Sequence, residues 1–586
     1  MNFFSFLSLI GGLALFLYGM DMMGEGLKKL SGGKLESILE KLTSNRFMGF
    51  LLGLFVTAII QSSSASTVML VGFVNSGIMR LSQTISIIMG ANVGTTVTAW
   101  ILSLTGINGD SFFINLFKPS SFTPVLAACG VLLIMISSSD KKKNLGEIFI
   151  GFAILMYGME AMSSSVSGLK DSKAFVNILV MFSNPVMGIL SGTILTAIIQ
   201  SSSASVGILQ ALSTTGAISY STAIPIILGQ NIGTTITPII SSINGNTDSK
   251  RVAFSCLFIK LIGVIIVSSV FYILNSFMNF AFMTESVDVV KIAVIHTAFN
   301  IISTIILIPF CGAIEKVAVK VIKGSDGETD GKTDSLDTLD ERFLDLPTFA
   351  VEKCKNLVDE MTEMTYTSII GASALTNNFR TEEFDKIKSI ENKVDRYEDK
   401  IGSYLVKLAA HELNAADGKR VTEYLHIIGD VERISDHAVN IAKTALEIHK
   451  KGVAFSSDAK RETDILKSAV AEILQITKKA FSTDDAELAK SVEPLEQIID
   501  RLKKKIKNNH ILRLREGECT MEHGFILSDL LTNYERVADH CSNIAACILS
   551  IKNDSFETHD YLYHVKNDGE NEFFEKYDYY KHKYTI

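Results

Sequence analysis

This sequence of 586 residues lacks the motifs typical of disulfide-rich proteins, of cleaved secretory signals and of enzymes. Its seven cysteines form no Cys-x-x-Cys pair and lie mostly in apolar or helical stretches, so we expect no disulfide framework and a reducing compartment for the polar part of the chain. No basic segment precedes the first apolar run, because the first lysine is Lys28, so we expect this run to be retained rather than cleaved as a secretory signal. The sequence has no nucleotide-binding loop and no nucleophile–base motif, so we do not expect an enzyme.

Charged residues are scarce in the first part of the chain. Residues 1–313 are rich in Leu, Ile, Val, Gly and Ser, whereas residues 314–586 are charged and mostly polar. The mean hydropathy of +0.29 is too high for an ordinary soluble protein. The net charge of −8 lies mainly in the second part and shows no basic footprint, so we expect no nucleic-acid partner.

The first part contains apolar stretches long enough to cross a bilayer, which takes about 20 helical residues. They lie near residues 3–23, 82–104, 122–138, 145–162, 222–242, 252–275 and 291–311. The fold class predicted is all-α, with a polytopic membrane domain over residues 1–313.

One sequence of ten residues, TAIIQSSSAS, occurs twice, at Thr57–Ser66 and again at Thr196–Ser205, 139 positions later. The same offset aligns GANVGTTVT at Gly90–Thr98 with GQNIGTTIT at Gly229–Thr237. Chance does not produce two motifs at one offset, so the chain contains an internal repeat. The repeats cover about residues 12–98 and 151–237.

Each repeat contains an apolar run that ends abruptly at Gln-Ser-Ser-Ser and is followed by a second apolar run. Each run has roughly 12 residues, about half a bilayer crossing for a helix. Irregular backbone at membrane depth is tolerated only where protein or a water-filled site surrounds it. We therefore predict two re-entrant helical hairpins, near residues 48–78 and 187–217, which in transporters mark the binding site.

Lysine and arginine in short loops predict the orientation, because cytoplasmic loops carry an excess of both. The loops that can all be cytoplasmic together contain Lys28, Lys29, Lys34, Lys41, Arg46, Arg80, Lys141–Lys143 and Lys250–Arg251. The other loops hold only Lys118, Lys170 and Lys173. The N-terminus is then outside and residue 314 inside. The two repeats are consequently inverted, with one hairpin entering from each face.

The two Gln-Ser-Ser-Ser corners and the two Asn-x-Gly-Thr-Thr segments form the candidate site. Helix N-termini offer free N–H groups to an anion, and Ser, Thr, Asn and Gln oxygens suit a hard cation such as Na⁺. The alternative is that these small polar residues only pack helices together. The candidate ligands are Gln61, Ser62, Ser63, Ser64, Asn92, Thr95, Thr96, Gln200, Ser201, Ser202, Ser203, Asn231, Thr234 and Thr235.

Three titratable residues near the spans are ambiguous. Asp21 and Glu160 occupy equivalent positions at the ends of equivalent spans, where they serve either a proton or cation pathway or simply the membrane interface. His296 lies in the last span, and we interpret it as a packed, hydrogen-bonded residue.

The second part begins with an acidic linker, residues 314–346, and continues as a helical domain over residues 347–551. ENKVDR at Glu391–Arg396 is repeated as EQIIDR at Glu496–Arg501, about 100 residues later, which predicts two helical bundles. Residues 552–586 form a charged, Tyr-rich tail.

Four Glu-x-x-x-Asp pairs occur in this helical domain, and the spacing of four places both carboxylates on one helix face. The pairs are Glu391/Asp395, Glu432/Asp436, Glu496/Asp500 and Glu535/Asp539. Like charges there repel, and a cation shared between adjacent helices would remove that cost. We predict divalent metal binding, with a solvated acidic face as the alternative.

The doubled Gln-Ser-Ser-Ser motif resembles the type II sodium–phosphate cotransporters in their bacterial form, and the helical domain resembles the PhoU domain, a pair of three-helix bundles linked with phosphate regulation. The resemblance implies phosphate and sodium sites at the two corners. It also implies multinuclear metal clusters at the Glu-x-x-x-Asp pairs.

Residues and resemblance together predict sodium-coupled symport of inorganic phosphate across the cytoplasmic (inner) membrane, with a cytoplasmic PhoU-like regulatory domain. We expect Na⁺ rather than a proton because the candidate ligands are neutral oxygens. The expected partners are phosphate, Na⁺, the lipid bilayer, a second copy in a homodimer and a cytoplasmic phosphate-signalling protein. Two alternatives stay open: a carrier or exporter of another small anion, and a membrane phosphate sensor that transports little.

Overall fold

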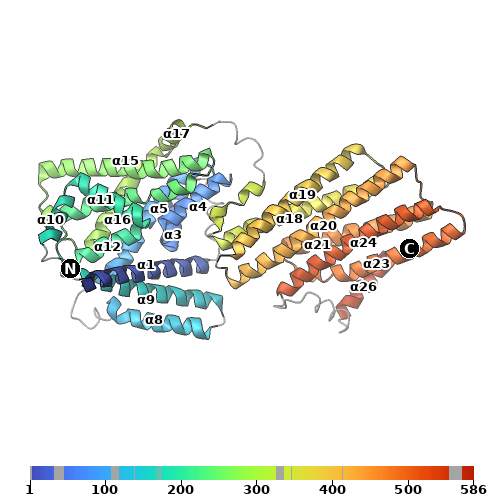
Figure 1. Cartoon of the computed structure of the whole chain (residues 1–586), viewed down its shortest axis with the longest axis horizontal. Helices are drawn as coiled ribbons and strands as arrows, with labels where there is room; N and C mark the ends of the chain where they lie inside the picture. The colour runs from blue at the N-terminus through green and yellow to red at the C-terminus, as the bar shows by residue number, and fades with distance from the viewer. Residues whose placement is uncertain are drawn as a thin grey trace. The chain divides into compact units, whose positions relative to one another are not determined.

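The structure is a computed structural model that describes residues 3–31, 45–106, 118–324, 335–552 and 571–586, apart from residues 138, 168, 170–172, 345 and 412. Of the residues used to predict the orientation, Lys34, Lys41 and Lys170 lie outside this described part. The chain divides into two compact units, Met1–Leu346 and Pro347–Ile586 (Figure 1).

Among the described residues of the first unit, seven helices or helix pairs are long and apolar enough to cross a membrane, which confirms the seven predicted spans. Four of the spans are single helices: α1 (Phe3–Ser31), α8 (Pro119–Ile136), α9 (Asp140–Val166) and α15 (Thr247–Met278). The last span begins as α16 (Val289–Leu307) and runs through a 3₁₀ turn into α17 (Cys311–Val321). Leu, Ile, Val and Phe on the outer faces of these helices are exposed in the protein alone, as expected of a surface that contacts lipid.

The other two spans are interrupted at the Asn-x-Gly-Thr-Thr segments. Helix α5 (Leu81–Gly94) ends one residue before α6 (Thr96–Ser103), and α13 (Tyr220–Gly233) ends two residues before α14 (Ile236–Ser242). Both breaks follow directly after a glycine, as expected of the residue with the lowest helix propensity after proline. The same sequence therefore interrupts the helix at the same place in both repeats.

Each predicted hairpin is a pair of short helices. The first consists of α3 (Arg46–Ile60) and α4 (Ser63–Asn75), and the second of α11 (Pro185–Ile199) and α12 (Ser202–Ser213). The first arm ends because the next residue adopts the left-handed conformation, with φ of 59° at Gln61 and 60° at Gln200. The lengths of the arms agree with the prediction of half-crossings.

The first arm of each pair packs tightly against the interrupted span that follows it. A Cβ atom at Gly90 would lie 1.9 Å from the carbonyl oxygen of Phe50, and one at Gly229 would lie 1.9 Å from that of Ile189. Only glycine permits these approaches of α5 to α3 and of α13 to α11. The two repeats thus share their packing as well as their sequence.

Helices α1 and α9, which are equivalent in the two repeats, lie side by side and antiparallel (Figure 1). Gly12 faces Gly158 near one end of the contact, and Gly19 faces Gly151 further along. These two contacts show that the helices run in opposite directions.

The described residues between 314 and 346 differ from the linker that the composition predicts. Helix α17 extends to Val321, and two short 3₁₀ turns, η5 (Ser335–Thr338) and η6 (Glu341–Phe343), belong to the first unit. The Phe343 ring is fully buried, with its centroid 5.4 Å from that of Phe73 on α4. Asn75 Nδ2, at the end of α4, donates to Asp340 Oδ2 over 2.7 Å. Composition alone did not predict this packing, because a segment that is polar on average can still pack through a few apolar residues.

The second unit contains two three-helix bundles. The first comprises α18 (Pro347–Leu375), α19 (Thr381–Ala409) and α20 (Ala415–Lys451); the second comprises α21 (Ser457–Thr483), α23 (Val492–Arg515) and α24 (Met521–Lys552), with the short α22 (Ala486–Ala489) between α21 and α23. The bundles meet along α20 and α24, where equivalent residues make reciprocal contacts. His540 Nδ1 lies 2.8 Å from Asp430 Oδ1, and His437 Nδ1 lies 2.8 Å from Asn533 Oδ1.

The described end of the predicted tail is a helix, α26 (Asn571–Lys583), which packs on α23. Phe573 and Tyr580 on this helix are buried, and Lys583 Nζ pairs with Glu472 Oε1 over 2.7 Å. The charged, Tyr-rich tail is therefore in part an element of the second unit.

Candidate functional site

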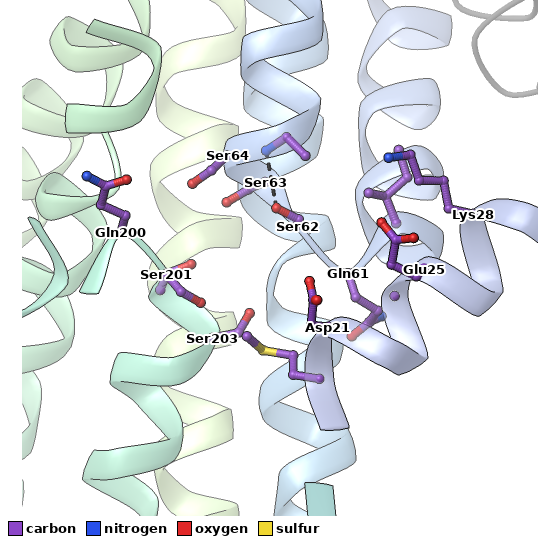
Figure 2. A pocket seen from close by; sticks show the side chains of 15 residues that line it. Asp21, Glu25, Lys28, Gln61, Ser62, Ser63, Ser64, Gln200, Ser201 and Ser203 are labelled. Atoms are coloured by element: carbon purple, nitrogen blue, oxygen red, sulfur yellow. Dashed lines mark hydrogen bonds between the residues drawn. The ribbon is translucent and has the colours of Figure 1, made fainter. Parts of the chain in front are cut away.

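The two Gln-Ser-Ser-Ser corners face one another across a cavity of about 260 Å³ in the first unit (Figure 2). All eight corner residues predicted as ligands line it, from Gln61 to Ser64 and from Gln200 to Ser203. The structure therefore brings together two motifs that are 139 positions apart in the sequence.

Both corners present a helix N-terminus to the cavity. Ser62 caps α4, since its hydroxyl accepts from the backbone N–H of Ala65 over 3.1 Å, and Ser201 caps α12 by accepting from Ala204 over 3.2 Å. The remaining N–H groups of each first turn have no acceptor within the helix. Two positive dipole ends therefore point into one cavity, an arrangement that favours an anion.

The two equivalent glutamines lie in different surroundings. Gln61 is buried, and its amide is held on both sides: Nε2 donates to the carbonyl oxygen of Ala58, and Oε1 accepts from Thr98 Oγ1 over 2.8 Å. Gln200 is exposed, and no hydrogen bond of its side chain is found within the described residues. Gln61 is thus a rigid part of the wall, whereas Gln200 is available to a ligand.

A second difference concerns the hydroxyls behind the corners. In the first repeat Thr57 Oγ1 donates to Ser66 Oγ over 3.0 Å. The equivalent Thr196 Oγ1 and Ser205 Oγ are fully buried and have no hydrogen-bond partner among the described residues. The repeats are therefore alike in backbone but not in their polar contacts.

The six predicted ligands in the Asn-x-Gly-Thr-Thr segments do not line the cavity. Asn92 is half-buried, whereas Thr95, Thr96, Asn231, Thr234 and Thr235 are buried. The first segment reaches the corner indirectly, through the hydrogen bond from Thr98 to Gln61. These residues support the corners or form separate polar sites.

Helix α1 contributes residues beyond the two corners, of which the repeat pattern had indicated only Asp21. Met20, Asp21, Gly24, Glu25 and Lys28 line the cavity, and the three charged residues among them follow the spacing of one helix face (Figure 2). That spacing was the available signal. Glu160, the counterpart of Asp21, is exposed and does not line the cavity.

In the second unit, the acids of the first bundle gather between α19 and α20. Burial and the nearby Asp395 and Asp436 carboxylates raise the pKa of Glu391. Burial, followed by Asp436 and Asp395, likewise raises the pKa of Glu432. None of these four carboxylates forms an ion pair with Lys or Arg within the described ranges. This set fits a cation by its charge, although the described residues contain no group of three or more His, Cys, Asp or Glu side chains close enough to hold a metal ion.

The acids of the second bundle are paired with basic side chains. Lys504 pairs with Asp500 over 2.6 Å, and Lys503 pairs with Glu535 over 2.7 Å. Arg536 contacts Asp539 over 3.4 Å. Because these ion pairs already balance charge, the second bundle fits a metal less well than the first.

Comparison of the sequence with known proteins identifies the family to which the chain belongs. The model of the Na⁺/Pi-cotransporter family matches the chain twice, over residues 15–164 and 154–291. The protein YqeW of Bacillus subtilis is 30% identical over 295 residues, which cover 50% of this chain and 91% of YqeW. The chain belongs to the Na⁺/Pi-cotransporter family. Each of the two matches to the family model covers nearly all of one of the two repeats, and the PhoU domain model matches residues 355–445 and 464–548, within the two bundles.

Other relatives carry informative names. A Salmonella typhimurium protein named "Putative inorganic phosphate export protein YjbB" is 23% identical over 567 residues, covering 95% of this chain and 99% of the relative. The sodium-dependent phosphate transport protein 2A of Rattus norvegicus is 39% identical over 99 residues, 16% of this chain and 15% of the relative. Among solved structures, PhoU from Pseudomonas aeruginosa matches 35% of the chain and 97% of its own, with 21% identity and a TM-score of 0.33.

Proposed function

We propose that this cotransporter moves inorganic phosphate together with Na⁺ across the cytoplasmic membrane, and that both bind at the cavity between the two corners. The observation that carries this proposal is the convergence of two capped helix N-termini, α4 and α12, on one cavity. N–H groups and serine hydroxyls are donors to phosphate, and serine oxygens are ligands for Na⁺. Both can therefore occupy the same site without an arginine.

Sodium coupling is favoured over proton coupling by the character of the cavity. Eight of its lining residues are neutral Gln and Ser. On the side formed by α1, the carboxylates of Asp21 and Glu25 outnumber the ammonium group of Lys28, and this excess of negative charge attracts a cation and repels a lone phosphate. Phosphate accompanied by Na⁺ is consequently a better occupant than phosphate alone.

We further propose that the repeats are inverted in the membrane, with the corner hairpins re-entrant, the N-terminus outside and the PhoU-like unit in the cytoplasm. The antiparallel packing of the equivalent helices α1 and α9 supports the inversion, and the lysine and arginine distribution supports the orientation. We include in this proposal a homodimer, a cytoplasmic signalling partner and a divalent metal held by the first-bundle carboxylates, as the sequence resemblance implies.

Export of phosphate is a second candidate, favoured by the name of the Salmonella relative, which aligns with 95% of the chain. Purified protein in proteoliposomes decides between the two. Radiolabelled phosphate uptake should require an inward Na⁺ gradient, and neither K⁺ nor choline should replace Na⁺. Uptake that is equal in choline and driven by a pH gradient would refute sodium coupling. Phosphate binding without transport in either direction would indicate a sensor.

A further inference from the structure

Lys260 places an amino group deep within the first unit, in the middle of the spanning helix α15. The residue is only 5% exposed, and its Nζ donates a hydrogen bond to Thr234 Oγ1. It forms no ion pair with Asp or Glu within the described residues. The titratable groups that interact with it are Cys256, one turn earlier on α15, and His296 on α16. A charged residue at such a position is rare and generally functional.

The partner of Lys260 belongs to the second Asn-x-Gly-Thr-Thr segment, where we expected a mobile cation to bind. Thr234 donates its own hydroxyl hydrogen to the carbonyl oxygen of Asn231 over 2.7 Å, so its lone pairs are free to face a cation. The Asn231 side chain donates to Asn300 Oδ1 over 3.0 Å, and Asn300 donates to the carbonyl oxygen of His296 over 2.8 Å. The polar groups of this segment are therefore satisfied by the protein itself.

The first repeat has the same oxygens without the ammonium group. Thr95, the counterpart of Thr234, donates its hydroxyl hydrogen to the carbonyl oxygen of Ala91 over 3.0 Å. No Lys or Arg contacts Thr95 in the part of the chain that the structure describes. The half-buried Asn92, the counterpart of Asn231, has a side chain without a hydrogen-bond partner there. Within the described residues, no ammonium or guanidinium group therefore takes the place beside Thr95 that Lys260 takes beside Thr234.

We propose that Lys260 is a tethered cation that occupies the ion position beside Thr234, while the equivalent position beside Thr95 and Asn92 binds a mobile Na⁺. This inference rests on the proposed sodium coupling and adds to the cavity a second Na⁺ position behind the first corner, which the hydrogen bond from Thr98 to Gln61 connects to the corner. An ammonium group at hydrogen-bonding distance from Thr234 excludes a second cation there by repulsion and supplies one positive charge that stays with the protein. If both segments bound Na⁺, two Na⁺ ions would accompany the phosphate at these positions. With Lys260 in one of them, only one Na⁺ binds there.

The test measures phosphate uptake by the full-length protein in proteoliposomes as a function of Na⁺ concentration. Lys260→Ala removes the charge and opens space, so a Na⁺ should enter and the Hill coefficient for Na⁺ should rise by about one. Lys260→Met fills the space without a charge and should lose uptake, whereas Lys260→Arg should keep the Hill coefficient of the parent. An unchanged Hill coefficient in folded Lys260→Ala protein would overturn the inference.

A second pair of variants covers the case in which the Lys260 variants do not fold. Thr95→Val removes a ligand of the mobile ion and should raise the Na⁺ concentration that half-saturates phosphate binding by roughly tenfold, the effect of losing one contact of about 1.4 kcal/mol. Thr84→Val is the control, because Thr84 is a buried threonine on α5 whose hydroxyl donates to the Leu81 carbonyl oxygen, and it should leave that concentration unchanged. Equal shifts in both variants contradict the inference. If the parent protein shows no Na⁺-dependent uptake, this result refutes the proposed function rather than the inference about Lys260 alone.

Discussion

Gly19 and Gly151 face each other across the contact between α1 and α9. A Cβ atom at Gly19 would lie 2.7 Å from the Gly151 carbonyl oxygen, and one at Gly151 would lie 2.9 Å from the Gly19 carbonyl oxygen. The repeat offset maps these two residues onto Gly158 and Gly12, which face each other in the same way. A pseudo-two-fold axis therefore relates one half of the contact to the other. Only glycine fits where the two helices are closest.

This contact predicts a large effect from a small substitution. In Gly19→Ala, the new methyl group would lie 2.3 Å from the Leu155 backbone nitrogen, so the helices must move apart. We expect a loss of about 1–3 kcal/mol, typical of overpacking, measured as thermal stability in detergent. Gly11→Ala is the matched control, because a Cβ at Gly11 meets nothing within 4 Å. Equal stability of the two variants would contradict the close contact.

The corner glutamines should respond differently to charge. Gln61→Glu places a carboxylate oxygen against the Ala58 carbonyl that now accepts from the amide, and adds negative charge to the phosphate cavity. Like charges about 4 Å apart cost roughly 4 kcal/mol at an effective dielectric near 20. We expect Gln61→Glu to weaken phosphate binding, measured by calorimetry at fixed Na⁺, far more than Gln61→Ala does.

Gln200→Glu should have a smaller effect than Gln61→Glu, because the exposed Gln200 side chain can turn its charge toward water. Sequence symmetry alone would predict equal effects. If both glutamate variants bind phosphate as tightly as the parent, the corners are packing features and not the site.

The topology can be tested with single cysteines. Lys142 is exposed, close to the start of α9, and we expect it to be cytoplasmic. In Lys142→Cys, in a background without the seven native cysteines, an impermeant maleimide should label the residue only after the membrane is opened. Cys129 must be replaced first, since it is the exposed one among the native cysteines. Labelling of intact cells at position 142 would refute the inverted arrangement.

The packing of Phe343 predicts where the transport unit ends. A chain that stops at Leu346 keeps the Phe343–Phe73 contact and should transport phosphate without the PhoU-like unit. A chain that stops at Ile322 uncovers Phe73 and should lose about 1.5–3 kcal/mol of stability, the worth of one buried aromatic side chain. Phe343→Ala in the full-length chain should reproduce part of this loss. A folded but inactive Leu346 chain would show that the second unit takes part in transport.

The acids of the first bundle predict a pH dependence. The pKa of Glu432 is raised in the folded protein, so the contribution of Glu432 to stability is fully present below the ordinary glutamate pKa of 4.5 and is lost as the pH rises through the folded value. Glu432→Gln should remove this fall and stabilise the metal-free second unit at neutral pH by about 0.2–0.5 kcal/mol, as for one like-charge helix pair.

Divalent metal should raise the melting temperature of the parent second unit more than it raises that of the Glu432→Gln variant, as measured by thermal melting with and without chelator. Glu535→Gln is the control in the second bundle, where Lys503 already pairs with Glu535 and the loss of charge should destabilise. If metal has no effect on either melting curve, the acidic residues form a solvated face.

The sequence by itself was sufficient for the membrane spans and the two corners, although not for the elements of the predicted linker and tail. The seven spans follow from the length of the apolar runs, because a helix in lipid must satisfy its own backbone. The corners at Gln61 and Gln200 follow from an apolar run that stops at three serines, and the breaks at Thr95 and Thr234 follow from the preceding glycine. These features depend on neighbours along the chain, so they could be predicted from local pattern alone.

Only the tertiary structure decided which equivalent residues keep equivalent roles. Gln61 and Gln200 have the same neighbours in sequence, yet Thr98 fixes the first, whereas no described residue forms a hydrogen bond with the side chain of the second. Thr95 and Thr234 likewise match, but α15 brings Lys260 to one of them. Helices outside the repeats pack differently on the two copies, and a polar side chain takes its partner from whichever helix lies beside it. Such contacts depend on three-dimensional packing, which an internal repeat in the sequence cannot reveal.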